Sequence, residues 1–108
     1  MSIHVVNKEL VNFAATPKVN FVLIDRTTLW GNPYKIDAMH DRSMVLEMYT
    51  AYLIRQLERK GAYYREFLKL VDVYRKTNNL ALVCHCKPLD CHGDILAEYL
   101  EIEAWDLT

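Results

Sequence analysis

Residues 80–94 read LALVCHCKPLDCHGD, and this stretch decides the fold. Its first five residues are apolar, too few for a helix of their own, and they follow the turn-forming pair Asn78-Asn79. We expect a central strand there. Residues 94–103 carry apolar side chains at helical spacing, which predicts an amphipathic helix. The stretch therefore leads the chain from a strand, through a loop dense in polar side chains, into a helix.

Two further strands are predicted toward the amino terminus. Residues 2–7 are rich in Ile and Val, and residues 20–25 contain Phe, Val, Leu and Ile in a row, which favours a strand buried on both faces. Between them, residues 8–14 could form one or two helical turns before the pair Thr16-Pro17, which discourages a helix.

Two consecutive helices are predicted in the middle of the chain. Apolar side chains repeat at helical spacing from residue 42 or 43 to residue 60, Gly61 ends or kinks that helix, and the period resumes over residues 64–76. Strands separated by helices predict a parallel sheet with flanking helices, in two or three layers. We expect a single α/β domain over residues 1–108.

Composition and charge argue against several classes of protein. The 108 residues carry 13 Lys and Arg against 14 Asp and Glu, so there is no basic field to hold duplex nucleic acid. No apolar stretch approaches the roughly 18 residues that a membrane helix needs, and the first residues lack the features of a signal peptide. We expect a cytoplasmic protein that binds neither duplex nucleic acid nor a membrane.

The segment from Cys84 to Asp94 carries the first group of candidate site residues. It leaves a strand at its carboxyl end, where ligands collect in open α/β sheets. A helix that starts near Cys91 or His92 would direct free N–H groups at an anion and favour the thiolate of Cys91. Gly93 would let the anion approach, and Lys87 would add positive charge. Asp94 or His92 could serve as a general acid or base.

Three interpretations of the cysteines stay open. Zinc could be held by Cys84, Cys86, Cys91 and His92, although the paired C-x2-C spacing of common zinc sites is absent, so no metal or other cofactor is assigned. A nucleophilic or redox cysteine could use a neighbouring histidine as its base. Alternatively, Cys84 and Cys86 are small buried residues at a strand end.

The segment from Arg26 to Tyr34 carries the second group, again directly after a predicted strand. Trp30 offers an aromatic face for a base, Arg26 a guanidinium for phosphate, and Thr27 a hydroxyl. Gly31-Asn32-Pro33 has the chemistry of a turn, so the alternative is a structural turn with Trp30 in the core. Arg42, at the start of the long helix, could reach the same cleft or lie in solvent.

These motifs resemble a family of small bacterial and phage proteins known as domain of unknown function 4326. The similarity spans nearly the whole chain and is most specific in WGNP at residues 30–33 and in the CxCKPxxCHGD pattern of residues 84–94. The resemblance also implies a small Rossmannoid or flavodoxin-like fold, of the kind found in nucleotide-processing proteins. By similarity, the signature positions are Arg26, Trp30, Gly31, Asn32, Arg42, Cys84, Cys86, Lys87, Cys91, His92, Gly93 and Asp94.

The leading functional hypothesis is a pocket for a nucleotide or nucleotide-derived small molecule. Turnover would make the protein a hydrolase acting on a phosphoester or N-glycosidic bond, with Asp94, His92 and Cys91 as the catalytic residues. A non-catalytic phage-type sponge or inhibitor, working in the host cytoplasm, is one alternative, and a small zinc or redox protein is another. A homodimer face could be formed by aromatic residues among Tyr49, Tyr52, Tyr63, Tyr64, Tyr74 and Trp105.

Overall fold

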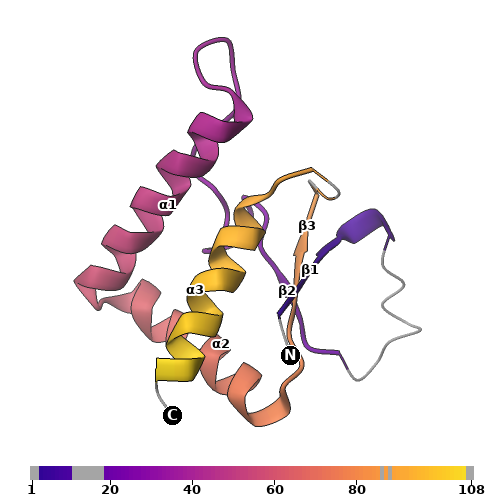
Figure 1. Ribbon diagram of the computed structural model, residues 1–108, viewed down its shortest axis with the longest axis vertical. Helices are drawn as coiled ribbons and strands as arrows, with labels where there is room; N and C mark the ends of the chain where they lie inside the picture. Colours follow the sequence, from indigo (N-terminus) through magenta and orange to yellow (C-terminus); the bar gives the residue numbers. More distant parts are fainter. Residues whose placement is uncertain (1–2, 11–18, 86, 88, 107–108) are drawn as a thin grey trace.

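A computed structural model describes residues 3–10, 19–85, 87 and 89–106. In this part of the chain a parallel sheet of three short strands lies beside three α-helices (Figure 1). The strands are β1 (His4–Asn7), β2 (Phe21–Leu23) and β3 (Ala81–Cys84). The helices are α1 (Arg42–Arg59), α2 (Ala62–Thr77) and α3 (His92–Asp106), preceded by a short 3-10 helix, η1 (Lys8–Leu10).

The last strand in sequence is the central strand of the sheet. The order is β1-β3-β2, with every pair parallel, and Leu82 of β3 lies opposite Val5 on one side and Val22 on the other. All four residues of β3 are buried, as predicted. The prediction that residues 20–25 form a strand buried on both faces was wrong for β2, which is only half-buried because it is paired on one side.

One hydrophobic core joins the helices to one face of the sheet. Leu82 and Cys84 point from β3 into this core, and they meet side chains from all three helices. The largest fully buried of these are Tyr49, Leu53, Phe67, Val71, Leu96 and Leu100. The helices accordingly lie together on one side of the sheet in Figure 1, so the described residues form two layers.

Local sequence signals explain where the helices begin and end. The Asp41 carboxylate accepts a hydrogen bond from the Met44 backbone N–H, which caps the start of α1. Lys60 ends α1 in the left-handed conformation with φ 54°, and Gly61 starts α2 immediately. The predicted pair of helices is therefore confirmed, with a complete break at Gly61.

Other boundaries differ by a few residues. A short helical structure between the first two strands was predicted over residues 8–14, and η1 occupies its first three residues, whereas residues 11–14 lie outside the described part. The last helix begins at His92, two residues before the predicted start. None of the described helices is both long and apolar enough to cross a membrane.

Candidate functional site

A cavity of about 140 Å³ lies at the carboxyl ends of β2 and β3. Three segments far apart in the sequence form its walls: the loop from Asp25 to Ile36, the first turns of α1, and the segment from Cys84 to His92. The two polar segments singled out in the sequence thus meet at one opening, where parallel strands place their following loops.

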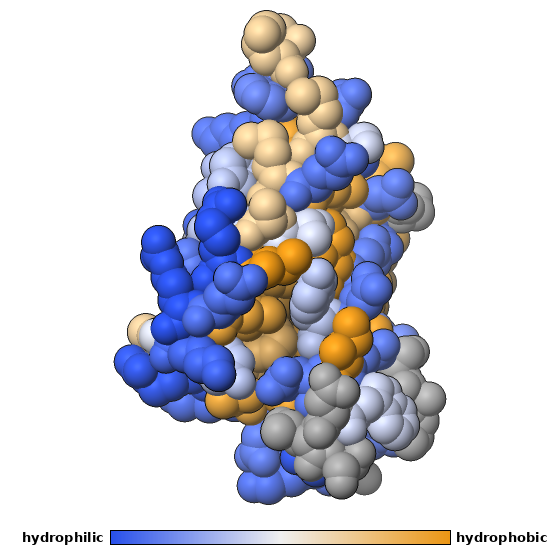
Figure 2. All heavy atoms as spheres, turned by 60° about the vertical axis from the view of Figure 1, so that its left-hand side comes forward, coloured by the Kyte–Doolittle hydropathy of each residue, from blue (hydrophilic) through white to orange (hydrophobic). Residues whose placement is uncertain are grey.

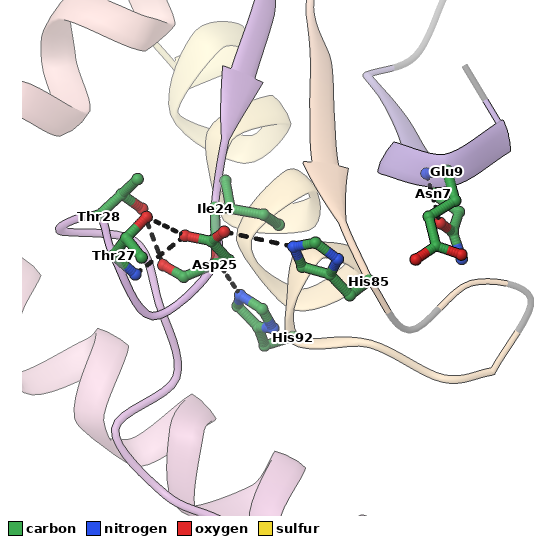
Figure 3. Close-up of polar contacts among 8 residues, drawn as sticks. All are labelled: Asn7, Glu9, Ile24, Asp25, Thr27, Thr28, His85 and His92. Carbon is green, nitrogen blue, oxygen red and sulfur yellow. Dashed lines mark hydrogen bonds and ion pairs between the residues drawn. The ribbon is translucent and has the colours of Figure 1, made fainter.

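His92 lies in the wall of this cavity with a defined hydrogen-bonding state. Its Nε2 is 2.7 Å from the carbonyl oxygen of Ile24, and because a carbonyl only accepts, Nε2 carries the proton (Figure 3). The lone pair of Nδ1 then faces the Cys91 Sγ at 3.6 Å. Burial lowers the pKa of His92 and the positive charge of Arg26 acts in the same direction, so the ring is neutral near pH 7.

Cys91 caps α3 in a reciprocal arrangement with Asp94. The sulfur of Cys91 accepts the Gly93 N–H at 3.4 Å, and the Asp94 carboxylate accepts the Cys91 N–H at 3.2 Å. This is a capping box in which a thiol replaces the usual hydroxyl. The Asp94 carboxylate also pairs with Lys87, with 2.6 Å between Nζ and Oδ1, and this hydrogen bond raises the pKa of Lys87.

Two residues predicted for the site lie outside its cavity. Lys87 and Asp94 do not line the cavity, and they border instead a separate hollow beside β1 that also contains His4 and Glu98. Asp94 was predicted as a general acid or base and Lys87 as a phosphate ligand. The structure places the two side chains on the β1 side of α3, where they pair with each other, and the roles predicted for them stay predictions.

Gly93 is required for packing, which corrects the role predicted for it. A Cβ at this position would lie 2.7 Å from Cδ1 of Ile24 and 2.8 Å from Cγ1 of Val5. The side chains of Ile24 and Val5 therefore fill the space that a side chain at residue 93 would need. The missing side chain lets the first turn of α3 lie directly on β1 and on the residue after β2.

Arg26 and Arg42 contribute positive charge to the cavity from two different segments, the loop after β2 and the start of α1. Arg26 donates from Nε to the Asn32 carbonyl at 3.2 Å and from Nη2 to the Tyr34 carbonyl at 3.0 Å. Arg42 donates from Nη1 to the Asp90 carbonyl at 2.9 Å. Some N–H groups of both arginines have no hydrogen-bond partner within the described residues. These are Nη1 of Arg26 and the Nε and Nη2 of Arg42. Each guanidinium is thus held in place with N–H groups left for a ligand.

The WGNP turn has a mainly structural part in the site. Trp30 is 7 % exposed and packs edge-on against Tyr63 with 5.0 Å between ring centroids, so the predicted stacking on a ligand is corrected to a core position. A Cβ on Gly31 would lie 2.4 Å from the Asp25 carbonyl oxygen, so only glycine lets this loop close. Asn32 lines the cavity, and its Oδ1 accepts the Tyr34 N–H.

Two site residues were missed by the sequence predictions. Asp25 and His85 follow β2 and β3, and both line the cavity, with 3.3 Å between Oδ2 and Nε2. Thr27, which was predicted to bind ligand, donates its N–H and its hydroxyl to the Asp25 carboxylate instead (Figure 3). The hydrogen bond from the Thr27 hydroxyl is the main cause that lowers the pKa of Asp25. The signal that could have identified Asp25 and His85 is their position close after the ends of two adjacent strands, β2 and β3.

The chain matches one known protein family over most of its length. Residues 9–102 match the family described as Domain of unknown function (DUF4326). The chain belongs to the DUF4326 family. No curated protein and no solved structure matches the chain. Of the two motifs singled out in the sequence, WGNP shapes one wall of the cavity and CHGD supplies Cys91 and His92 to another.

The cysteines of this DUF4326 protein are only partly placed. Cys84 and Cys91 are buried in the lining of the cavity, while Cys86 lies outside the described residues. Among the residues that are described, no three His, Cys, Asp or Glu side chains group closely enough to hold a metal ion. The described residues therefore offer thiol chemistry and hydrogen bonding at this cavity.

Proposed function

We propose that the cavity binds a nucleotide or nucleotide-derived small molecule through its phosphate. The observation that carries this proposal is the pair of anchored guanidiniums, Arg26 and Arg42, each with N–H groups left for a ligand. Planar guanidinium groups match the oxygens of phosphate and bind them with charge-assisted hydrogen bonds. The buried Asn32 adds an amide nitrogen that has no partner within the described residues.

The rest of the cavity wall suits an uncharged ring or sugar. Ile36, Val45 and Leu46 give it apolar surface, and Tyr34 supplies the aromatic face that Trp30 does not. The volume of about 140 Å³ is smaller than the roughly 300–1,000 Å³ of sites that enclose a drug-sized ligand. We therefore expect the phosphate and one adjoining moiety inside, with the remainder of the ligand over the exposed His85 and Ile36.

The arrangement of the sheet supports the same proposal. Rossmann-like folds bind nucleotides at the carboxyl ends of parallel strands, and the cavity occupies that edge of the β1-β3-β2 sheet. We propose that the domain is a small Rossmann-like variant. This assignment is an analogy of fold, and the arginines carry the functional argument.

Calorimetry against a panel of mononucleotides, dinucleotides and inorganic phosphate tests the proposal. We expect binding by the wild-type protein and a loss of about tenfold or more in affinity for Arg26→Ala and for Arg42→Ala, since each removes a charge-assisted hydrogen bond. Arg65→Ala, on the exposed surface of α2, is the matched control and should bind as the wild type does. No heat from any ligand, or unchanged affinity in both cavity variants, would contradict the proposal.

Recovery of the bound molecule separates an enzyme from a binding protein. The alternative of a sponge or inhibitor uses the same cavity without turnover. After incubation and denaturation of the protein, intact nucleotide indicates sequestration, whereas product indicates catalysis. Elemental analysis of the purified protein tests the remaining zinc alternative.

A further inference from the structure

We infer that Cys91 is a nucleophile, activated by His92, that attacks the phosphorus of a phosphoester bound in the cavity. This inference rests on the proposed function and extends it from binding to phosphoryl transfer. Three observations carry it: the hydrogen-bonding state of His92, the surroundings of the Cys91 sulfur, and the position of both residues in one wall of a cavity that also holds two arginines.

The imidazole of His92 is oriented to accept a proton from Cys91. Its Nε2 donates to the Ile24 carbonyl at 2.7 Å, which fixes the tautomer and leaves Nδ1 as the acceptor. Nδ1 lies 3.6 Å from Sγ, a distance compatible with a hydrogen bond to sulfur. Tyr49 holds the ring from the side, with 5.1 Å between the centroids.

The electrostatic surroundings keep His92 in its basic form. Burial and the charge of Arg26 lower its pKa, while its hydrogen bond to Ile24 and the carboxylates of Asp94 and Asp25 act in the opposite direction. The net direction is downward, so the ring is neutral and able to take a proton near neutral pH. In the step that we infer, the imidazole takes the thiol proton when an electrophile reaches the sulfur.

The Cys91 sulfur is also placed to bear negative charge. It accepts the Gly93 N–H at 3.4 Å and lies at the amino terminus of the 15-residue helix α3, where the helix dipole favours an anion. Cys84 offers an internal comparison. It lines the same cavity and is 1 % exposed, as Cys91 is, yet within the described residues it has no histidine or N–H partner.

The chemical step balances with water as the only co-substrate. The sulfur lone pair forms an S–P bond while the ester P–O bond breaks, the thiol proton passes to Nδ1 of His92, and the imidazolium then protonates the leaving oxygen. In the second half, Nδ1 takes a proton from water, the water oxygen attacks phosphorus, and the S–P electrons return to sulfur, which regains the proton. Arg26 and Arg42 would stabilise the charge on the phosphoryl oxygens.

Alkylation of the folded wild-type protein by iodoacetamide, mapped to each cysteine by mass spectrometry, tests the nucleophile directly. We expect Cys91 to react on the order of tenfold faster than Cys84, since only Cys91 has a base and an N–H donor. Inorganic phosphate should protect Cys91. His92→Gln should slow the alkylation of Cys91 while its amide still donates to the Ile24 carbonyl, which keeps the fold. Equal rates at the two cysteines, or no effect of His92→Gln, would overturn the inference.

Turnover gives the second measurement. We expect release of phosphate from p-nitrophenyl phosphate or a mononucleotide by the wild type and by Arg65→Ala, which lies on the exposed surface of α2 away from the cavity. Cys91→Ser, whose hydroxyl still caps α3, should lose this activity. Undiminished turnover by a folded Cys91→Ser would refute the nucleophile. Normal nucleotide binding without faster alkylation at Cys91 overturns this inference alone. Conversely, an activated Cys91 without any nucleotide binding overturns the proposed ligand alone.

Discussion

The chemistry of Trp30 is compatible with two different roles, ligand binding and core packing, and its surroundings decide between them. An indole is equally suited to stacking on a base and to filling a core. Here its ring packs edge-on against Tyr63, and its carbonyl lies 3.4 Å from the Tyr49 hydroxyl, which donates to it. The helices that bring Tyr49 and Tyr63 to this place therefore decide the role of Trp30. Tyr34, four residues later, lines the cavity in its stead.

Residues that the sequence grouped as one polar loop divide between two faces of the molecule. Cys91 and His92 line the cavity, whereas Lys87 and Asp94 pair beside β1. In a helix, consecutive side chains point about 100° apart. His92 and Asp94, both in the first turn of α3, therefore point in different directions. The positions of Cys91 and His92 in the lining could be anticipated from the motif, but the direction of Asp94 could not.

His92 makes the stability of the protein depend on pH in a definite direction. Burial lowers its pKa in the folded state below the ordinary value of 6.5 that applies to the unfolded chain. As the pH falls through 6.5, the unfolded chain therefore takes up a proton that the folded protein does not. We expect the contribution of His92 to the free energy of unfolding to fall on acidification, by at most about 1.4 kcal/mol per pH unit.

Urea unfolding at pH 7.5 and at pH 5.5 measures this effect, with His92→Gln as the comparison. The wild type should lose more stability between the two pH values than the variant does. Asp25, whose pKa the Thr27 hydroxyl lowers from 3.8, changes protonation below this window and does not interfere. Parallel losses in the two proteins would mean that His92 takes up a proton equally in the folded and unfolded states.

At the scale of secondary structure, local patterns predicted which segments form helices and strands. Helical spacing of apolar residues marked α1 and α2, and the apolar run at residues 81–84 marked β3. The misjudged feature was the burial of β2. Its apolar sequence resembles that of a central strand, but its place at the sheet edge depends on pairing with residues of β3 that lie 60 positions later in the chain.

The contact between α3 and the sheet has a sharp steric limit at Gly93. We expect Gly93→Ala to lower the free energy of unfolding by about 1–3 kcal/mol, because its Cβ would overlap Ile24, which is fully buried, and Val5, which is partly buried. The better helix propensity of alanine offsets at most about 1 kcal/mol of this cost. Chemical denaturation measures the difference.

Gly61→Ala is the matched control for this substitution. A Cβ at Gly61 has no atom within 4 Å, and Gly61 also stands at the start of a helix. We expect Gly61→Ala to lower the free energy of unfolding by only about 0.5–1 kcal/mol, because alanine caps a helix less well than glycine but meets no steric overlap here. A Gly93→Ala protein as stable as Gly61→Ala would show that α3 can move away from the sheet without loss.

At the scale of the whole molecule, most of the tyrosines considered for a homodimer face are not on the surface. Tyr49, Tyr63 and Tyr74 were considered for a homodimer face, but they are buried, and Tyr52 and Tyr64 are half-buried against the core. Figure 2 shows apolar residues gathered in a band on the face turned toward the viewer, with hydrophilic residues along its left side. The large exposed apolar side chains of the described residues are Leu10, Leu29, Ile36, Met39, Met44, Leu89, Ile102 and Trp105.

A homodimer stays a prediction, and Trp105 offers its test. Trp105 is 65 % exposed and Trp30 is 7 % exposed, so acrylamide should quench the first strongly and the second weakly. Trp105→Phe should leave only weakly quenched emission. If two chains pair through the end of α3, quenching of Trp105 falls as protein concentration rises. Strong quenching in Trp105→Phe would place Trp30 in solvent and contradict the core described above.

Patterns in the amino-acid sequence are sufficient to predict the parallel α/β class, the order of the elements, the family and the meeting of two polar segments at one sheet edge. These features depend on periodicity, turn chemistry and the rule that parallel strands end together. Only the tertiary structure decided which side chains face the cavity. Asp25 contacts His85, which is 60 residues away in the sequence, and the Ile24 carbonyl accepts a hydrogen bond from His92, which is 68 residues away. Such contacts depend on packing between distant segments, which no local pattern encodes.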